Sequence, residues 1–387
     1  MRRRALLALA LVLALLAAAG LARREEIARL LAVNALFDED RIVWNFSHMG
    51  TMFDTVPMPS PPHAPSPLPA AATPIALPAD VEDWIARRNV TGLVVLRRGE
   101  IVHEEYRLGT APDDLRISWS VAKSFLAALL GTVLEEGAIA SLDDPVTRYA
   151  PRLAGSAYDG ATIRDVLMMS SGVAFNEDYL DFWSDINRMG RALALGRSLD
   201  DFATDLHETI APPGTEFHYV SIDTHVLGMV IRGATGRRIP ELMNARILTP
   251  LGLERDPYYL ADGHGNAFVL GGLNLTTRDY ARFGEMILQG GRWQGRQIVP
   301  ADWVREMTTE AAPFRPDMKA RYALHWWLPR DARPGEVFAE GIYSQFIWID
   351  RAAGVVIAMN AADRAFEEPG VHDEIIAMLR RITEIAR

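Results

Sequence analysis

Ser120 and Lys123 stand three residues apart in the run SVAK, at the start of a long apolar stretch that is typical of a helix. On a helix, this spacing places the hydroxyl and the amine on one face, within reach of each other. Lys123 is one of only two lysines among the 40 Lys and Arg residues, the other being Lys319. Lysine can give up its proton near neutral pH, whereas arginine cannot. The pattern predicts a serine nucleophile beside an activating amine, on a helix buried at the centre of the fold.

Strand patterns lie at both ends of the main domain, and helical patterns lie between them. Residues 92–96 and 101–106 are β-rich runs joined by a short polar turn, which predicts a hairpin. The helix that carries Ser120 is expected to end at Gly137. Residues 141–270 have the pattern of helix and loop, and the remaining strands and a final helix are expected at 322–328, 345–349, 355–359 and 371–385. This order predicts an α+β fold and not a repeated βαβ unit.

The composition restricts the possible classes of function. With 49% hydrophobic residues over 387 positions, the chain can bury a core of two lobes. A net charge of −10 leaves no basic stripe for phosphates, so no nucleic-acid partner is expected. The absence of cysteine excludes disulfides, thiol catalysis and thiolate metal sites. The nine histidines show no His-Glu-x-x-His spacing, so neither a metal nor another cofactor is predicted.

The amino terminus has the pattern of a membrane-targeting segment. Three arginines at positions 2–4 precede an uncharged run over residues 5–22, and two further arginines close it. Such a run is at the lower limit of what spans a bilayer, and its small residues suit a signal peptidase. Residues 1–24 are therefore expected to be a cleaved signal peptide or a retained membrane anchor, and both remain open. Either would place an exported catalytic domain in the periplasm or on the outer side of a membrane.

Residues 25–78 are expected to connect this segment to a main domain over residues 79–387. Ile27, Leu30 and Leu31 have helical spacing, which predicts an amphipathic helix. The following loop carries aromatic residues that we expect to pack on the main domain, namely Trp44, Phe46 and Phe53. Nine prolines within residues 57–78 favour an extended linker over packed structure.

Further sequence blocks accompany the Ser120 and Lys123 pair. They are residues 142–146 (LDDPV), 163–172 (IRDVLMMSSG), 213–221 (PGTEFHYVS), 250–253 (PLGL) and 271–284. Together they resemble the serine β-lactamase and penicillin-binding superfamily, in particular its class C type and the 6-aminohexanoate-dimer hydrolases. The resemblance covers about residues 81–381, which argues against a chance pairing of Lys123 with one of 14 serines. It implies an antiparallel sheet flanked by helices, plus a mostly helical lobe.

The resemblance also implies roles for single residues. Ser120 would be acylated, and Lys123 would be its neighbouring cation or base. Tyr219 would relay the proton to the leaving group, with Ser221 as its hydrogen-bond partner. Whether Lys123 or Tyr219 is the general base stays open. Three tryptophans could line an acyl pocket, although isolated aromatic residues more often belong to the core: Trp183, Trp326 and Trp327.

The third motif departs from the superfamily. Residues 340–345 (EGIYSQ) stand where Lys-Thr-Gly or His-Thr-Gly is usual, and they resemble the Gly-Ile-x-Gly-Gln version of the dimer hydrolases. The resemblance implies an oxyanion hole from the backbone amides of Ser120 and Ile342, with Gly341 and Tyr343 beside the substrate. Tyr179, in the NEDY run at 176–179, would be another substrate contact or a surface-loop residue. Because residues 340–345 lack the lysine or histidine of that usual motif, penicillin is a weaker candidate as a substrate.

The predicted function is a serine hydrolase that forms an acyl-enzyme on Ser120. Its expected substrates are small molecules or short peptides, cleaved at an amide bond or a carboxylic ester. A β-lactamase or a D-alanyl-D-alanine carboxypeptidase is the enzymatic alternative. A silent sensor or binding module is the non-enzymatic alternative, and the joint presence of Ser120, Lys123 and Tyr219 argues against it.

Overall fold

The computed structural model describes residues 23–59, 65–309, 312–313 and 318–387, together with scattered residues before position 23. Most of the predicted targeting segment at 5–22 lies outside the described residues. Within the part that is described, no helix is both long enough and apolar enough to cross a membrane.

The main sheet has seven strands, and every neighbouring pair is antiparallel. The predicted hairpin forms its first two strands, whereas the single strand expected at 322–328 is two strands with His325 in a left-handed conformation between them. In spatial order the strands are β3 (Glu100–Tyr106), β2 (Val90–Arg97), β13 (Val355–Ala361), β12 (Gln345–Asp350), β11 (Glu336–Gly341), β10 (Trp327–Pro329) and β9 (Ala320–Tyr322). The predicted α+β class is confirmed.

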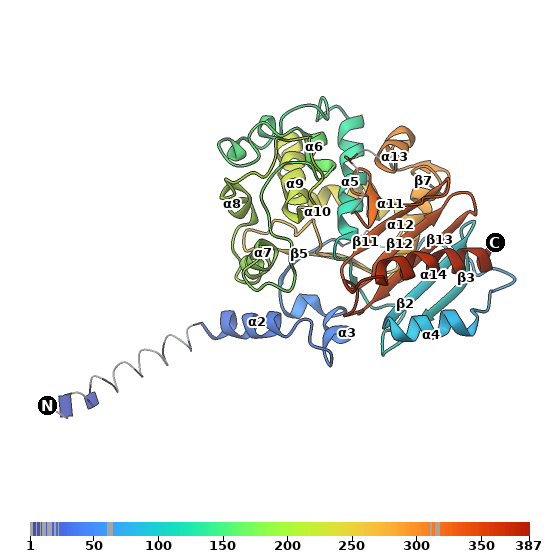
Figure 1. Cartoon of the computed structure of the whole chain (residues 1–387), viewed down its shortest axis with the longest axis horizontal. Helices are drawn as coiled ribbons and strands as arrows, with labels where there is room; N and C mark the ends of the chain where they lie inside the picture. Colours follow the sequence, from blue (N-terminus) through green and yellow to red (C-terminus); the bar gives the residue numbers. More distant parts are fainter. Residues whose placement is uncertain are drawn as a thin grey trace.

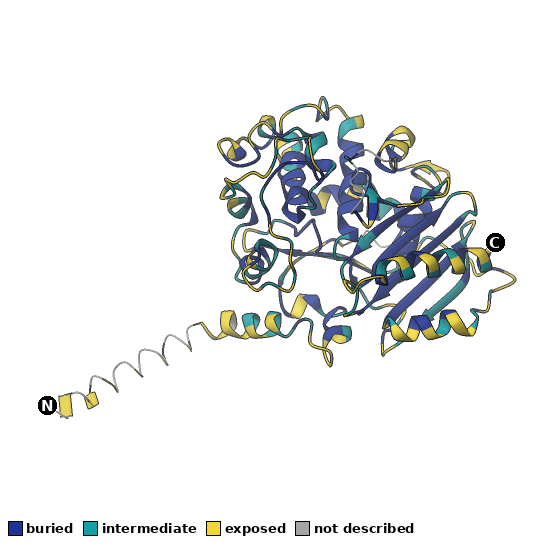
Figure 2. Cartoon of the chain, in the orientation of Figure 1, coloured by how far each residue is buried: buried dark blue, intermediate teal, exposed yellow. Residues whose placement is uncertain are grey.

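Helices cover both faces of this sheet, as Figure 1 shows. Alternate residues of a strand point to opposite faces, so Val94 belongs to the buried cluster that also contains residues of α5 (Val121–Glu135) and α12 (Thr277–Leu288). Val95 packs on the other face with α4 (Ala79–Arg87) and α14 (Val371–Ala386). The sheet is therefore buried on both faces, while α4 and α14 keep an exposed outer side (Figure 2).

A mostly helical lobe lies beside the sheet and meets it along α5 (Figure 1). Its helices are α6 (Ile163–Leu167), α7 (Asp185–Ala194), α8 (Leu199–Thr204), α9 (Ser221–Thr235), α10 (Ile239–Met243) and α11 (Thr249–Leu251). Left-handed glycines end two of its helices, Gly236 after α9 and Gly252 after α11. Near the sheet lie α13 (Ala301–Met307) and the small hairpin of β7 (Arg292–Trp293) and β8 (Arg296–Gln297).

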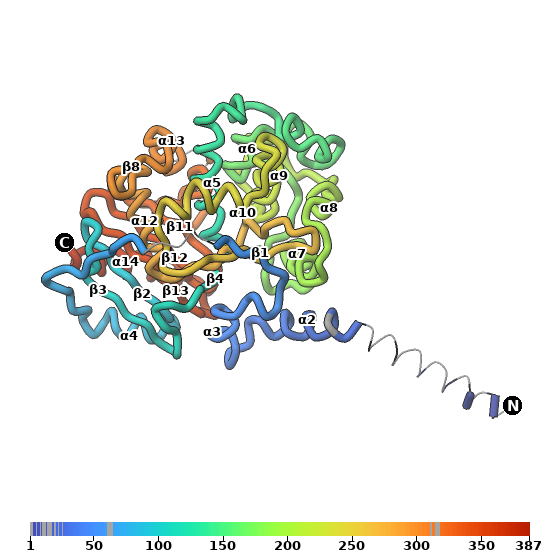
Figure 3. The backbone as a smooth tube through the Cα atoms, turned by 180° about the vertical axis from the view of Figure 1, so that it is seen from behind, coloured from blue at the N-terminus to red at the C-terminus, as the bar shows by residue number. Residues whose placement is uncertain are grey.

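The segment before the main domain is built into the fold. It forms α2 (Arg24–Asn34), α3 (Ile42–Asn45) and β1 (Asp54–Pro57). In a second, four-stranded sheet, β1 pairs with β5 (Tyr258–Ala261), followed by β6 (Leu273–Leu275) and β4 (Arg116–Ile117). Figure 3 shows β1 and β4 from behind. Phe46 and Phe53 are buried as expected, whereas Trp44 is half exposed.

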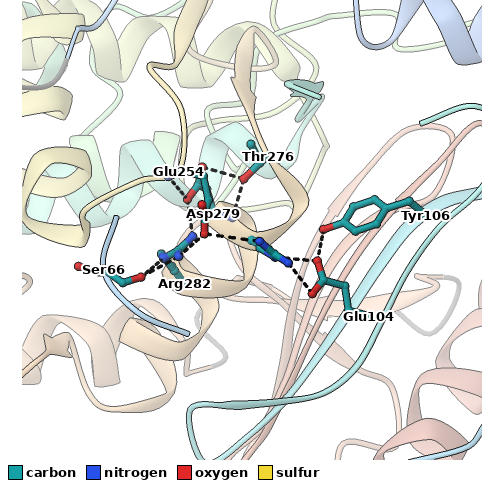
Figure 4. A network of polar contacts seen from close by, with 8 residues as sticks. Ser66, Glu104, Tyr106, Glu254, Thr276, Asp279 and Arg282 are labelled. Carbon is teal, nitrogen blue, oxygen red and sulfur yellow. Dashed lines mark hydrogen bonds and ion pairs between the residues drawn. The ribbon is translucent and has the colours of Figure 1, made fainter. Parts of the chain in front are cut away.

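The described part of the proline-rich segment has little regular secondary structure and lies along the main domain. The backbone carbonyl of Ser66 accepts two hydrogen bonds from the buried Arg282 guanidinium, at 2.7 and 3.1 Å. Arg282 also pairs with Asp279 and Glu254, as Figure 4 shows. This network fastens the segment to α12.

Candidate active site

Ser120 lies immediately before the first turn of α5, at the centre of the molecule. Its backbone is helical, with φ −64° and ψ −8°, while the preceding Trp119 has a φ of +43°. The chain therefore turns sharply into the helix, and the free amides of the first turn surround the serine with partial positive charge. The residues of α5 from Val121 to Val133 are buried, as predicted for a central helix.

Lys123 is 2% exposed, and its amine contacts three oxygens. Its Nζ lies 2.9 Å from Ser120 Oγ, 3.3 Å from Ser221 Oγ and 3.0 Å from the backbone oxygen of Leu270. Burial lowers the pKa of Lys123 from 10.5 to about 8, although the negative charges of Glu177 and Asp223 oppose this shift. Near neutral pH, a fraction of the amine is therefore neutral and can accept a proton.

Tyr219 and Ser221 flank the start of α9 and complete the cluster around Ser120. The Tyr219 ring stacks on Trp327 at 5.7 Å between centroids, and Lys123 Nζ lies 5.2 Å from the Tyr219 ring centroid. Burial and then the charge of Glu177 raise the pKa of Tyr219, while hydrogen bonds with Ser120 and Ser221 partly oppose them. The phenol consequently keeps its proton near neutral pH.

Glu177 is a site residue that the sequence interpretation missed. Its carboxylate accepts hydrogen bonds from the Ser221 backbone amide at 3.0 Å, from the Ser221 hydroxyl and from the Tyr179 hydroxyl at 2.8 Å. Only its place two residues before Tyr179 offered a signal, because Ser221 is 44 positions away. Tyr179 lies in the cleft beside Ser120, and this carboxylate holds it there.

The turn from β11 to β12 runs past the backbone of Ser120. A Cβ atom on Gly341 would lie 3.0 Å from the Ser120 amide nitrogen and 2.7 Å from the Ser118 oxygen, so only glycine fits. Tyr343 and Ser344 both have left-handed backbones, with φ of +58° and +65°. The buried Gln345 amide holds this turn by donating hydrogen bonds to the backbone oxygens of Ile342, Tyr343 and Ala361.

Two cavities meet at Ser120. The larger, of about 870 Å³, is lined by Tyr219, Trp327, Gly341 and several charged residues. The smaller, of about 290 Å³, is mostly apolar. Ser120, Tyr179 and Ile342 line both.

Some predicted contacts lie elsewhere. Tyr343 lines neither cavity and stacks on Phe37 at 4.7 Å. Trp326 is fully buried in the core, Trp183 is 74% exposed, and Trp327 lines the larger cavity.

A buried polar network lies beneath the cluster. Asp223 Oδ1 accepts hydrogen bonds from the Tyr158 hydroxyl at 2.7 Å and the Ser171 hydroxyl at 2.9 Å. Burial raises the pKa of Asp223 to about 8. No sequence pattern singled out Asp223, since a buried carboxylate is recognised only from its surroundings. Among the described residues, no group of three or more His, Asp or Glu side chains is placed to hold a metal ion.

The fold and the arrangement around Ser120 define a class, the serine hydrolases with a β-lactamase and transpeptidase fold. The Beta-lactamase family model matches residues 81–379. The chain is 33% identical to a 6-aminohexanoate-dimer hydrolase of Paenarthrobacter ureafaciens, over 82% of this chain and 85% of that protein. The chain belongs to the Beta-lactamase family, and the resemblance inferred from its motifs is confirmed.

Two further similarities also indicate a hydrolase. Esterase EstB of Burkholderia gladioli is 31% identical over 48% of this chain and 52% of that protein. A solved structure from Bacillus anthracis, provisionally named a 6-aminohexanoate-dimer hydrolase, has a TM-score of 0.78 and 24% identity, covering 90% of this chain and 95% of that one. The chain is therefore an enzyme, a serine hydrolase acting on amides or esters.

Proposed function

We propose that the chain cleaves amide or ester bonds through a covalent acyl-enzyme on Ser120. The observation that carries this proposal is the contact of 2.9 Å between Ser120 Oγ and the buried Lys123 amine. A hydroxyl becomes a good nucleophile when a neighbouring base removes its proton. Lys123 is the base, because its pKa is lowered to about 8 whereas the pKa of Tyr219 is raised.

In the first step, Ser120 Oγ bonds to the substrate carbonyl carbon and its proton passes to Lys123 Nζ. The neutral amine can donate its two hydrogens to Ser221 and the Leu270 carbonyl, which leaves its lone pair toward Ser120. The carbonyl oxygen becomes an oxyanion, held by the backbone amides of Ser120 and Ile342. Such donors contribute mainly through their fixed orientation.

In the second step, the bond to the leaving group breaks and Tyr219 gives the departing nitrogen or oxygen a proton. Lys123 returns a proton to Tyr219 through the Ser221 hydroxyl, whose own hydrogen turns from Glu177 toward Tyr219 in this step. Water then attacks the acyl carbon, and the same groups move protons in the reverse direction until Ser120 regains its own.

The candidate substrates are short amides, short peptides and carboxylic esters. A β-lactamase activity is the second candidate, favoured by the family match. Against it, the third-motif strand supplies Glu340 in place of the cation with which other members hold a substrate carboxylate, and the nearby Lys319 is paired with Glu340 at 2.8 Å. Turnover of nitrocefin that is lost in Ser120→Ala would favour this second candidate.

The test of the acyl-enzyme is covalent labelling. A fluorophosphonate probe should modify Ser120, and mass spectrometry should locate one adduct on its peptide. Ser120→Ala should lose the adduct and the turnover of p-nitrophenyl acetate, while Ser141→Ala, at a residue that lines neither cavity, should keep them. An adduct-free Ser120 in a folded, native chain would contradict the proposal.

We also propose that the enzyme is exported, on the support of the arginines at positions 2–4 and the apolar run at 5–22. Fractionation of cells that express the full chain should place it outside the cytoplasm. Amino-terminal sequencing then separates a cleaved signal peptide from a retained anchor. Recovery of the whole chain in the cytoplasm would overturn this proposal.

A further inference from the structure

The two cavities that meet at Ser120 differ in chemistry. The larger one is lined by charged side chains of both signs, the carboxylates of Glu177, Glu340, Glu367, Glu368 and Asp373 and the cations of Lys319 and Arg330. The smaller one is walled largely by aliphatic and aromatic side chains from several elements. Its volume of about 290 Å³ is near the lower limit for small-molecule pockets. A substrate bound across Ser120 must therefore place a polar part in the larger cavity and an apolar part in the smaller one.

The position of Tyr219 indicates which cavity receives the leaving group and which receives the acyl group. A general acid must lie within hydrogen-bond reach of the atom that it protonates. Tyr219 lines the larger cavity and not the smaller one, so the leaving group must depart into the larger cavity. The acyl substituent lies on the other side of the reacting carbon, next to Ser120 and Ile342, which line both cavities.

One wall of the smaller cavity comes from the segment that precedes the main domain. Val33 at the end of α2 and the nearby Phe37 line it, as do Leu193 and other residues of α7, which α2 contacts. The Phe37 ring lies 4.7 Å from Tyr343 and 5.7 Å from Trp119. Residues before position 79 therefore contact the residues next to Ser120 and Ile342, whose backbone amides form the predicted oxyanion hole.

The charge at the smaller cavity also affects which acyl groups can bind there. Arg191 lines it, and its guanidinium lies 4.1 Å from the centroid of the Phe182 ring. No carboxylate pairs with Arg191 among the ion pairs of the described residues. An acyl chain that ended in an ammonium group would meet this cation and apolar walls, and would lose its hydration there.

Building on the proposed acyl-enzyme function, we propose that the smaller cavity is the acyl site, and that it selects a hydrocarbon acyl group without a positive charge. Its amino-terminal wall makes residues 33–37 specificity determinants of the enzyme. The substrate class is an ester or amide with an apolar acyl chain and a polar leaving group.

The experiment holds the leaving group constant and varies the acyl group. We expect kcat/KM for p-nitrophenyl hexanoate to exceed that for the acetate by about 10-fold or more, since each buried methylene favours binding. The 6-aminohexanoyl ester should be about 10-fold poorer than the hexanoyl ester, because its ammonium group would meet Arg191 and apolar walls.

Matched variants locate the effect. Val33→Trp should remove the advantage of hexanoate over acetate, because the larger side chain would fill the smaller cavity. Leu31→Trp, on the exposed side of the same helix, should keep the wild-type pattern. Leu193→Phe tests the opposite wall if the first variant fails to fold, which thermal unfolding would reveal.

The outcomes separate this inference from the proposed function. Equal rates for all acyl groups, a preference for the positively charged acyl chain, or an unchanged pattern in a folded Val33→Trp would overturn the acyl-site inference, provided that Ser120→Ala abolishes turnover. Turnover that survives in Ser120→Ala would instead overturn the acyl-enzyme itself.

Discussion

At the scale of single residues, Lys123 must be both buried and able to release its proton. A buried ammonium is costly, and the three oxygens around its Nζ only partly compensate for the loss of water. The resulting pKa of about 8 makes proton exchange with Ser120 possible near neutral pH. An arginine would keep its proton there.

The pH dependence of acylation follows from this shift. Below a pH of about 8, Lys123 is mostly protonated and cannot act as a base, and above it the neutral amine predominates. We therefore expect the acylation rate to rise with pH and to level off above about 8. Stopped-flow release of p-nitrophenol checks this, and a rate that falls between pH 6 and 8 would contradict it.

Lys123→Arg should reduce acylation by at least about 100-fold, the usual contribution of a general base. The charge is retained, so a loss isolates the need for a removable proton. Single-turnover kinetics measure the rate, and circular dichroism checks the fold. A near-normal rate would mean that Lys123 acts only as a fixed cation.

Glu177 positions Ser221 and Tyr179 and touches neither reacting atom in the proposed steps. Glu177→Gln keeps the shape but loses the negative charge, so we expect kcat to fall about 10-fold. The acylation pH profile should also shift to lower pH, because the charge of Glu177 raises the pKa of Lys123. Glu135→Gln, at the exposed end of α5, is the control; an unshifted profile would argue against this role.

Among the elements, the turn between β11 and β12 decides the oxyanion hole. Two successive left-handed residues are costly, and the hydrogen bonds of Gln345 hold them in place. Gly341 allows the strand to pass close to the Ser120 amide.

Gly341→Ala should displace this strand, because the added methyl group would lie 2.7 Å from the Ser118 oxygen. We expect kcat to fall by about 100-fold or more, as when an oxyanion donor is lost. Gly50→Ala is the control, since its methyl group would meet only Thr55 and Tyr258, at 3.4 Å or more. Full activity of Gly341→Ala would show that the hole lies elsewhere.

At the scale of the whole molecule, Arg282 of α12 binds the proline-rich segment to the main domain. Removing one partner of a buried ion pair costs about 3–5 kcal/mol. Arg282→Met should therefore lower the free energy of unfolding by about that amount in urea denaturation. Arg305→Ala, which breaks an exposed pair with Asp302, should cost less than about 1 kcal/mol. Equal losses in both variants would contradict a clamping role for Arg282.

Much of this protein follows from local patterns in the sequence. The apolar run after Ser120 specifies a buried helix, and the hairpin of β2 and β3 follows from two β-rich runs around a short turn. The Ser120 and Lys123 spacing predicts their contact because one helical turn brings the two side chains together. These predictions succeed because each depends on neighbours within a few positions.

The remaining features depend on residues that are far apart in the chain. Glu177 reaches Ser221, Gly341 reaches Ser120, and Val33 reaches the pocket beside the nucleophile only after the lobes, the sheet and the amino-terminal segment have packed. The pKa of Lys123 belongs to this group as well, since burial sets it and burial depends on the whole core. Local propensity carries no information about such contacts, because their free energy comes from long-range packing and from the exclusion of water.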